Sequence, residues 1–258
     1  MASTFDISGP ALISFSGGRT SAYLLHRILQ RGLRNDVHVV FADTGKERSE
    51  TYDFVHECAA RWSVQVHWVR RPSPEGVLPF EQLITDRGYL PNPIMRMCTT
   101  ELKIRPMKRF MLDRGYEEWT MVLGIRADEP LRAAKLLAPT KERWDHRLPL
   151  YRAGITEAHV MKFWSTQPFD LALRPHEGNC DLCFLKTLTK RLDIVREHPD
   201  FVDWWARQEE RTGQQFKAAT KSRKGEPPYR SLPMLARASS SSSQGAEEGG
   251  SVDCVCHD

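Results

Sequence analysis

The sequence has no stretch of about 18 apolar residues, the length that a membrane-spanning helix needs. Its first residues, MASTFDISGPALISFSGG, also lack the basic and long apolar segments of a secretory signal. Neither sign of charge dominates, because 37 basic and 33 acidic residues give a formal net charge of +4. These absences predict a cytoplasmic protein with no membrane partner. The mild positive charge suits an anionic ligand but does not by itself indicate nucleic acid.

Cysteine is sparse, with six residues in a chain of 258, and no internal repeat is visible. Because thiols stay reduced in the cytoplasm, close cysteine spacings predict metal binding or redox chemistry rather than structural disulfides. Hydrophobic residues make up 40% of the chain, which is enough for a packed core. The length suits one large α/β domain, or one domain with a smaller appendage.

Apolar runs alternate with amphipathic segments through the first half of the chain. The runs ALISF, DVHVVFADTG and VQVHWVRR predict strands, and SAYLLHRILQRG and RSETYDFVHECAARW predict helices between them. Farther on, WTMVLGIRADE predicts a strand that runs into a polar loop. Three segments predict further helices: TTELKIRPMKRFMLDRG, ITEAHVMKFWSTQ and LTKRLDIVREHPDFVDWWARQEE. The alternation is typical of an α/β fold, with a parallel sheet sandwiched by helices.

Composition divides the chain into four parts. Residues 1–150 hold the alternating strands and helices and are expected to form the α/β domain. Residues 151–237 are expected to form a helical, cysteine-containing region packed on it. The low-complexity stretch ASSSSSQGAEEGGS, residues 238–251, predicts a flexible linker. The tail, residues 252–258, holds two cysteines with no packing role, so we expect it to return to a site elsewhere.

The stretch ISFSGGRTS places two adjacent glycines between a predicted strand and a predicted helix. The backbone N–H groups of such a turn converge, and the helix dipole adds positive charge, so the turn favours an anion. Gly17 and Gly18 would let the backbone approach phosphate oxygens, while the hydroxyls of Ser16, Thr20 and Ser21 would donate further hydrogen bonds. The stretch matches neither G-x-x-x-x-G-K-[ST] nor G-x-G-x-x-G, the two common phosphate motifs.

Three motifs occur in the order found in one nucleotide-binding family. S-G-G-x-[TD]-S after the first strand resembles the pyrophosphate loop of the ATP-pyrophosphatase superfamily. VFADTGKERSETYDFV resembles the second-strand motif of its phosphoadenosine phosphosulfate (PAPS) reductase branch, and GIRADEPLR resembles that branch's G-[IV]-R-x-x-E-[SP]-x-R motif. The resemblance extends from about residue 10 to residue 210. It implies an adenine nucleotide α-hydrolase-like fold.

The same resemblance implies a site for ATP or a sulfonucleotide. Arg126 would meet the phosphates or sulfate and stabilise the charge that develops there, with Arg132 assisting. Mg²⁺ would screen the pyrophosphate of ATP. The residues implied to hold phosphate or to line the nucleotide are Ser16, Gly17, Gly18, Arg19, Thr20, Ser21, Asp43, Thr44 and Gly45.

The spacing GNCDLCF predicts a cysteine cluster. Cys180 and Cys183 form a C-x-x-C pair that reaches one metal, but two thiolates do not complete a tetrahedral site. Four thiolates bind either zinc or a [4Fe–4S] cluster, and the spacing does not separate the two. The candidates for the missing ligands are Cys98, Cys254 and Cys256. The remaining cysteine, Cys58, lies in an amphipathic segment and is expected to be buried.

The family resemblance favours iron and sulfur. The chain looks similar to several relatives in the superfamily that act on sulfur nucleotides or thiolate nucleic acids and that pair a pyrophosphate loop with a cysteine-bound cluster. The implied ligands are Cys98, Cys180, Cys183 and Cys256, with Cys254 exchangeable for Cys256. The chain departs from two named activities. It lacks both the E-C-G-[IL]-H motif of thioredoxin-dependent PAPS reductases and the C-C…C-x-x-C set of adenylylsulfate reductases.

The combined pattern predicts an enzyme of sulfur chemistry, by sulfonucleotide reduction or by ATP-dependent sulfur transfer. Arg126 and Cys254 are the predicted catalytic residues, and protonated His257 would favour a thiolate in the tail. A reductase would need a thiol or electron-donor protein as partner. Two alternatives stay open. One is a nucleic-acid-modifying protein whose basic stretches LKIRPMKRF and KSRKGEPPYR contact phosphates, and the other is a nucleotide-binding protein without turnover.

Overall fold

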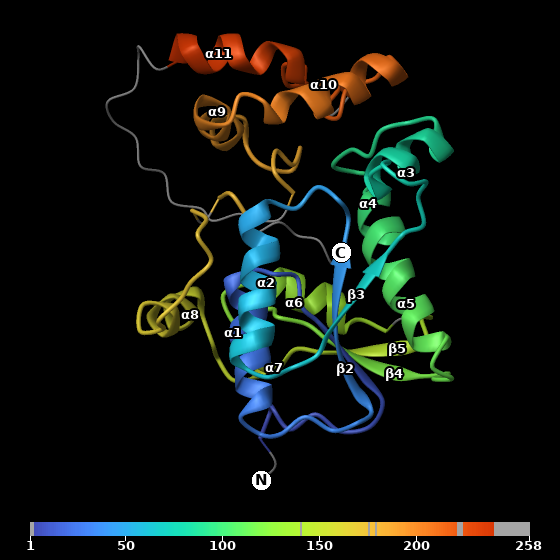
Figure 1. Cartoon of the computed structure of the whole chain (residues 1–258), viewed down its shortest axis with the longest axis vertical. Coiled ribbons are helices and arrows are strands. Elements are labelled where there is room, and N and C mark those ends of the chain that lie inside the picture. Colours follow the sequence, from blue (N-terminus) through green and yellow to red (C-terminus); the bar gives the residue numbers. More distant parts are fainter. Residues whose placement is uncertain (1–2, 140, 175, 179, 221–223, 240–258) are drawn as a thin grey trace.

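The computed structural model describes residues 3–139, 141–174, 176–178, 180–220 and 224–239. Most of the predicted linker and the whole predicted tail, including Cys254 and Cys256, lie outside these residues. A sheet with helices on both faces forms one part of the molecule, and a layer of helices lies beyond one end of the sheet (Figure 1). The division into four parts stays a prediction.

The sheet has five parallel strands in the order β3-β2-β1-β4-β5, which confirms the predicted fold class. The strands are β1 (Ala11–Ser14), β2 (Val37–Asp43), β3 (Val66–Arg70), β4 (Trp119–Val122) and β5 (Trp144–Arg147). The strand order reverses at β1, which pairs with β2 on one side and with β4 on the other. Open α/β sheets bind ligands outside the carboxyl ends of the strands at such a point.

Alternate residues of the central strands face opposite sides of the sheet, as the twofold period of a strand requires. Ile13 and Phe41 lie in the core under α1, α2 and α8, whereas Leu12 and Val40 lie in the core under α5 and α6. These helices are α1 (Arg19–Leu29), α2 (Ser49–Arg61), α8 (Glu157–Trp164), α5 (Arg105–Leu112) and α6 (Pro130–Leu137). The short helix α7 (Pro149–Arg152) follows β5 directly. Burial on both faces explains why the central strands are almost continuously apolar.

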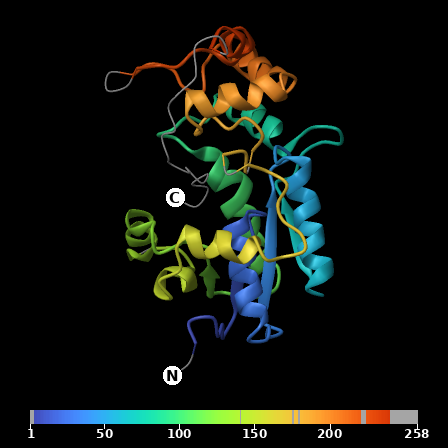
Figure 2. The ribbon, with the colours of Figure 1, turned by 90° about the vertical axis from the view of Figure 1, so that its left-hand side faces the viewer.

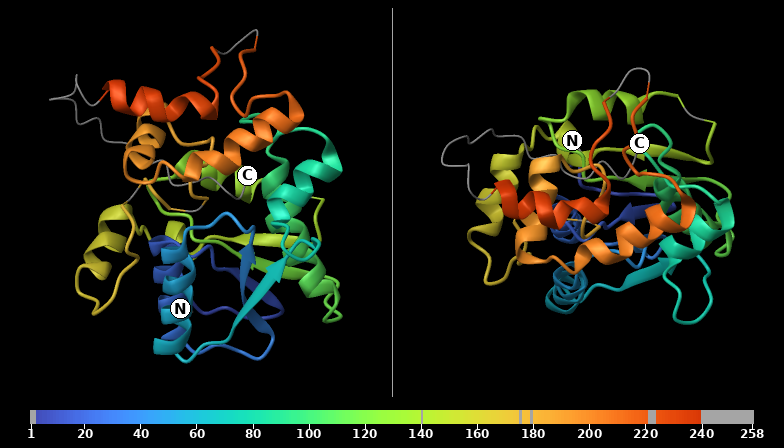
Figure 3. Two further views of the ribbon diagram at one scale, coloured as in Figure 1. Left: turned by 45° about the horizontal axis from the view of Figure 1, so that its top comes forward. Right: turned by 90° about the horizontal axis from the view of Figure 1, so that it is seen from above.

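A third core lies in the helical layer beyond the carboxyl ends of the strands (Figures 2 and 3). Trp205 is completely buried at this core, which also contains Phe80 and Leu83 from the first half of the chain. The elements of the layer are α3 (Pro79–Arg87), α4 (Met97–Thr99), α9 (Leu188–Glu197), α10 (Phe201–Thr212), the 3₁₀ turn η2 (Tyr229–Ser231) and α11 (Leu232–Ser239). The predicted helical C-terminal part is therefore confirmed, and α3 and α4 pack with it.

Two segments that were expected to be helical each contain a proline. The first, which begins at Thr99, is helical as expected. It forms a π-helical turn over Thr100–Ile104 and then α5, which accommodates Pro106 in its first turn. The second divides at Pro199 into α9 and α10. In the part of the chain that the structure describes, no helix combines the length and the apolar character that crossing a membrane requires.

Candidate nucleotide and cysteine site

The glycine loop, residues 16–21, joins β1 to α1 at the centre of the sheet. Gly17 has a φ of +75°, and a Cβ there would lie 2.6 Å from Cγ2 of Thr51 on α2. Packing against α2 therefore requires this glycine. Gly18 has a φ of −97°, and a Cβ there would meet one described atom within 4 Å, Ser16 Oγ at 3.8 Å. Since the fold does not need a glycine at position 18, its small size leaves the backbone open to a ligand.

Hydroxyl groups hold the rest of the loop. Ser16 Oγ donates to Ser21 Oγ at 3.0 Å, and Ser21 Oγ donates to the Gly18 carbonyl at 2.9 Å. Gly18 is the N-cap of α1, whose first turn has no acidic residue and no side-chain cap among the described residues. The first N–H groups of α1 thus face the loop without a side-chain acceptor, and the helix dipole favours an anion beside them.

Arg126 follows β4 and lies beside the glycine loop, where the sequence predicts it. Its Nη1 donates to Thr20 Oγ1 at 3.3 Å, and its side chain is 6% exposed. Gly124 explains this approach, because a Cβ at that position would lie only 3.2 Å from the Cα of Ser21. Close packing of the turn after β4 on α1 therefore carries a buried guanidinium to the predicted phosphate loop.

Carboxylates hold Arg126 and Arg132 in place. Arg126 Nε donates to Asp128 Oδ1 at 3.0 Å, and its backbone N–H donates to Glu129 Oε2 at 2.9 Å. Arg132 Nη1 donates to the other oxygen of Glu129 at 2.7 Å. Burial alone would raise the pKa of Asp128, but hydrogen bonds from the Glu157 N–H and from Arg126 lower this pKa. Arg132 thus supports the turn that carries Arg126 by binding Glu129.

Arg19 binds the segment that leads to the C-x-x-C pair. Its Nε and Nη2 donate to the two oxygens of Asp170 at 2.7 and 2.8 Å. Its guanidinium also donates to the carbonyls of Leu171 and Leu173, at 2.5 and 3.0 Å. The side chain is therefore committed to protein acceptors, and its role as a phosphate ligand stays a prediction.

The predicted nucleotide residues Asp43, Thr44 and Gly45 form the turn at the carboxyl end of β2. Asp43 Oδ1 accepts hydrogen bonds from the Gly45 N–H at 2.8 Å and from the Tyr52 hydroxyl at 2.7 Å. Thr44 Oγ1 donates to the carboxylate of Glu47 at 2.8 Å. Side chains of the turn and of the following residues hold its conformation, and it lies at the same edge of the sheet as the glycine loop.

The C-x-x-C loop docks on the segment that follows this turn. Cys180 forms an antiparallel bridge with Glu47, and the Asp181 N–H donates to the Lys46 carbonyl at 2.8 Å. Lys46 Nζ and Asp181 Oδ2 form an ion pair at 2.5 Å, with side chains only 9% and 11% exposed. The predicted nucleotide turn and the predicted metal ligands thus meet, although they are far apart in the sequence.

Aromatic rings enclose the pair of Lys46 and Asp181. Lys46 Nζ lies 4.7 Å from the ring centre of Trp204, and Trp205 Nε1 donates to Asp181 Oδ1 at 2.8 Å. A second ammonium group, that of Lys186, donates to two carbonyls of the cysteine loop at 3.0 and 2.9 Å. Lys186 therefore holds the backbone of the cysteine loop from within.

The described candidate ligands share one buried cluster. Cys180 and Cys183 are 7% and 4% exposed, and Cys98 packs against the same apolar side chains. Cys58 lies elsewhere, in the core under α1 and α2, where burial raises the pKa of its thiol. It is a buried apolar side chain, as expected. The predicted fourth ligand and its alternative lie outside the described residues and stay predictions.

A second group of possible ligands is bound by arginine. Within the described part of the chain, Glu177, Glu197 and His198 are the three His, Cys, Asp or Glu residues whose ligand atoms lie within 4.8 Å of one another. Arg174 binds both carboxylates at 3.1 and 2.8 Å, and Arg48 lies 3.3 Å from Glu177. Burial would raise the pKa of Glu177, but Arg174 and Arg48 lower it. The group is an ion-pair network and supports no metal assignment.

Sequence reasoning missed the residues that connect the two halves of the site. Lys46 stands inside the quoted stretch VFADTGKERSETYDFV, and Asp181 stands between the two cysteines. Their positions next to motif residues are a signal that could have drawn attention to them. Their pairing is not readable from the chain, because it depends on how the helical layer packs on the sheet.

The fold and the glycine loop place the chain among α/β proteins with a pyrophosphate loop. Residues 10–167 match the model of the phosphoadenosine phosphosulfate reductase domain. The chain is 34% identical over 201 residues to the uncharacterized nin region protein ORF290 of Escherichia phage lambda, and the alignment covers 69% of this chain and 67% of that protein. The chain therefore belongs to the PAPS reductase family. The family match ends at residue 167, earlier than expected, and so before the C-x-x-C pair.

Other similar proteins share less with the chain. It spans 41% and 27% of the length of two uncharacterized relatives from Methanocaldococcus jannaschii, MJ0066 and MJ0973. The PAPS reductase of Candida auris, solved as a phosphate complex, has 19% identity and a TM-score of 0.43, covering 61% of this chain and 72% of that one. The U34-tRNA thiolase NcsA of Methanococcus maripaludis, solved with its [4Fe–4S] cluster, has 14% identity and a TM-score of 0.44, covering 96% and 80%.

Proposed function

We propose that this chain is an enzyme that binds an adenine nucleotide at the carboxyl ends of the central strands and performs sulfur chemistry beside a cysteine-bound [4Fe–4S] cluster. The observation that carries the proposal is the docking of the cysteine loop on the turn after β2, through Cys180 with Glu47 and Asp181 with Lys46. A nucleotide on the glycine loop and a group on the cysteines would then share one site.

The phosphates of the nucleotide would lie over Gly18 and the first turn of α1. The backbone N–H groups there, the hydroxyls of Ser16 and Thr20 and the guanidinium of Arg126 would donate to the phosphates. Arg126 would stabilise the charge that develops during reaction, since it is buried and already oriented by Asp128. In the ATP-dependent form, Mg²⁺ would screen the pyrophosphate.

The cysteine cluster would hold the iron–sulfur group. Cys98, Cys180 and Cys183 contribute to one apolar cluster of the helical layer. Four thiolates bind either zinc or a [4Fe–4S] cluster, and the family resemblance favours iron and sulfur. The ammonium groups of Lys46 and Lys186 would offset the thiolate charge. When bound, a [4Fe–4S] cluster would supply electron transfer or a place to bind sulfur.

Two reactions fit this arrangement and differ in the bond that breaks. In ATP-dependent sulfur transfer, an oxygen of the acceptor attacks the α-phosphorus and pyrophosphate leaves with the bonding electrons. A hydrosulfide-level sulfur from a donor then attacks the activated carbon, and AMP leaves with the former acceptor oxygen and the C–O electron pair. In sulfonucleotide reduction, the thiolate of Cys254 attacks sulfur and the adenosine phosphate leaves with the S–O electron pair. A second thiol, from the protein or from a donor partner, then releases sulfite and is oxidised to a disulfide.

The test uses full-length protein purified without oxygen. Iron, labile sulfide and zinc are measured first, and about four iron and four sulfide per chain are expected for one cluster. The Cys180→Ser, Cys183→Ser double variant should be colourless, whereas Cys58→Ser should keep the cluster. The protein is then incubated separately with ATP, adenylylsulfate and PAPS, and pyrophosphate, sulfite and adenosine phosphates are measured. Zinc without iron would refute the cluster. Saturable nucleotide binding without any product would instead indicate the non-catalytic alternative.

A further inference from the structure

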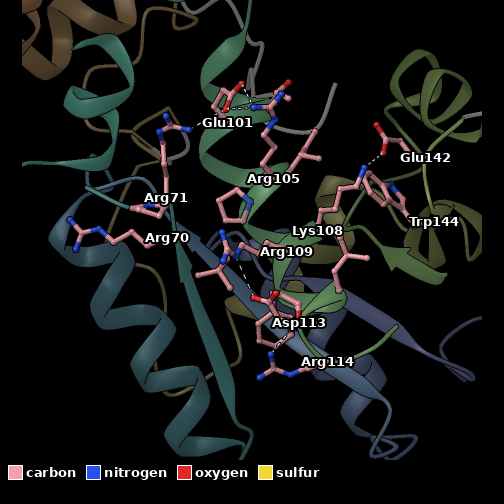
Figure 4. A pocket seen from close by; sticks show the side chains of 17 residues that line it. Arg70, Arg71, Glu101, Arg105, Lys108, Arg109, Asp113, Arg114, Glu142 and Trp144 are labelled. Carbon is pink, nitrogen blue, oxygen red and sulfur yellow. Dashed lines mark hydrogen bonds and ion pairs between the residues drawn. The ribbon is translucent and has the colours of Figure 1, made fainter. Parts of the chain in front are cut away.

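A groove of about 950 Å³ runs along the outer side of α5, between the end of β3 and the start of β5 (Figure 4). Six basic side chains line it against three carboxylates, those of Glu101, Asp113 and Glu142. The basic residues are Arg70, Arg71, Arg105, Lys108, Arg109 and Arg114. The groove therefore carries an excess of positive charge on a chain whose overall charge is nearly balanced.

Three of these cations stand on one face of α5. Arg105, Lys108 and Arg109 have the spacing i, i+3 and i+4, which places them side by side, and Arg105 and Arg109 are 61% and 78% exposed. Like charges at this spacing disfavour the helix slightly. Their ion pairs are weak because they are open to solvent: Lys108 binds Glu142 at 3.0 Å, and Arg109 lies 3.5 Å from Asp113. Phosphate groups could replace these partners at little cost.

A buried carboxylate organises the upper end of the groove. Glu101, whose side chain is 6% exposed, binds Arg71 at 3.2 Å, Arg87 at 2.5 Å and Arg105 at 2.9 Å. One negative charge thus orients three guanidinium groups, of which Arg71 also binds Asp86 at 2.8 Å, so positive charge stays in excess at this end of the groove. This end is close in sequence to Cys98, which lies in α4 immediately before the π-helical turn.

The same end of the groove reaches the nucleotide edge of the sheet. Arg70 ends β3 directly opposite Asp43 in the parallel register, and its Nε lies 3.8 Å from Asp43 Oδ2. A polymer that follows the groove along α5 would therefore arrive at the carboxyl ends of the strands. A ligand as small as a mononucleotide would leave most of the groove empty.

The lining favours nucleic acid over an acidic protein. Protein interfaces depend on apolar or aromatic anchors at their centre. Among the described lining residues the aromatic rings of Phe110 and Trp144 are only 9% and 5% exposed, and Leu112 is the one large apolar side chain that is exposed, at 40%. The absence of exposed rings also removes base stacking, so contacts would go to the sugar–phosphate backbone.

We propose that this groove binds the phosphate backbone of a nucleic acid, independently of its base sequence, and leads it to the nucleotide and cysteine site. Binding in the groove does not depend on the proposed reaction, whereas the use of the bound nucleic acid as sulfur acceptor rests on it. The proposal makes LKIRPMKRF, the basic stretch that contains α5, the principal contact.

The experiment measures the fluorescence anisotropy of labelled single-stranded DNA, duplex DNA and an RNA hairpin with full-length protein, from about 50 to 200 mM salt. The test variant is Arg105→Gln, Lys108→Gln, Arg109→Gln. The matched control, Arg34→Gln, Arg61→Gln, Arg207→Gln, removes the same charge from other exposed helices and loops. We expect the test variant to bind at least about 10-fold more weakly at the low salt concentration and to reduce the slope of log affinity against log salt by about two to three.

Four results would overturn the proposal. The first is failure of the wild-type protein to bind any of the three nucleic acids at low salt, and the second is binding by the test variant that equals that of the wild type. The third is a loss of binding in the control variant as large as that in the test variant. The fourth is competition by polyglutamate as strong as competition by unlabelled nucleic acid.

The affinities of both variants for ATP and PAPS are measured in parallel. Because the groove residues are not part of the proposed nucleotide pocket, these affinities should stay unchanged. Loss of nucleic-acid binding is thus distinguishable from failure of the proposed function.

Discussion

Replacing Lys46 by Met should weaken the docking of the cysteine loop on the nucleotide turn. Methionine has nearly the same length and keeps the contact with Trp204, but it leaves the Asp181 carboxylate buried without its cation. Removing one partner of a buried ion pair costs about 3 to 5 kcal/mol, because the remaining charge is no longer compensated. In a chain of this size that loss lowers the thermal midpoint by at least about 6 °C.

A double-mutant cycle isolates the pair from the rest of the packing. Asp181→Asn keeps an oxygen for Trp205 Nε1 while removing the charge, and the Lys46→Met, Asp181→Asn double variant has no buried charge at either position. The cost of the double variant should fall short of the sum of the single costs by about 2 to 3 kcal/mol. Urea unfolding followed by tryptophan fluorescence measures these costs, since Trp204 and Trp205 adjoin the pair.

An exposed ion pair supplies the control. Arg31 and Asp6 lie 2.8 Å apart with side chains 53% and 37% exposed, so Arg31→Met should destabilise the protein far less than Lys46→Met. The reasoning is refuted if Lys46→Met costs no more than this control. Additivity of the two single substitutions within about 0.5 kcal/mol would refute it as well, because it would mean that the two charges do not interact.

Three further predictions test the glycine loop, the buried arginine beside it and an ion pair at the start of α2. Gly18→Ala should leave the thermal midpoint nearly unchanged while weakening nucleotide binding at least about 10-fold. Normal nucleotide affinity of this variant in titration calorimetry would show that no phosphate approaches there. Gly17→Ala should instead cost about 1 to 3 kcal/mol of stability, because Gly17 has a positive φ and an added Cβ would meet Thr51. Arg126→Gln should lower kcat about 100- to 1000-fold with the fold retained, and activity within tenfold of wild type would remove Arg126 from the reaction. The hydrogen bond from Arg48 lowers the pKa of Glu50 to about 2 from 4.5, so Glu50→Gln should cost about 1 to 2 kcal/mol of stability after solvent screening. This loss of stability should be fully present above pH 4.5 and should disappear as the pH falls to about 2. Urea unfolding across this range measures the difference between wild type and variant, and a difference that does not change with pH would contradict the assignment.

Much of the sheet was predictable because local pattern determines it. The runs ALISF and DVHVVFADTG predict β1 and β2 from their composition alone, since strands buried on both faces are apolar throughout. The strand β5, WDHR, escaped prediction. Trp144 is the one buried side chain of its four residues, so the strand shows no such pattern. It lies at the edge of the sheet, where pairing with β4 determines its structure.

The candidate site was predictable as two separate parts. Motif spacing indicated the glycine loop, Arg126 and the C-x-x-C pair, but it could not show that Lys46 and Asp181 join them. That contact depends on the packing of α10 against the turn after β2, which no local pattern encodes. The reason for Gly17 was also incomplete. The sequence suggests that the glycine admits a phosphate, whereas the structure shows that it must also avoid Thr51.

The electron paramagnetic resonance spectrum of the reduced full-length protein, recorded with and without a saturating adenine nucleotide, tests most directly whether nucleotide and cysteines form one site. We predict that the nucleotide changes the spectrum of the iron–sulfur cluster in the wild-type protein, because the bridge at Glu47 and Cys180 and the ion pair at Lys46 and Asp181 connect the two loops. The change should be smaller in Lys46→Met, which lacks the ion pair. Identical spectra with and without bound nucleotide in the wild-type protein would contradict this account.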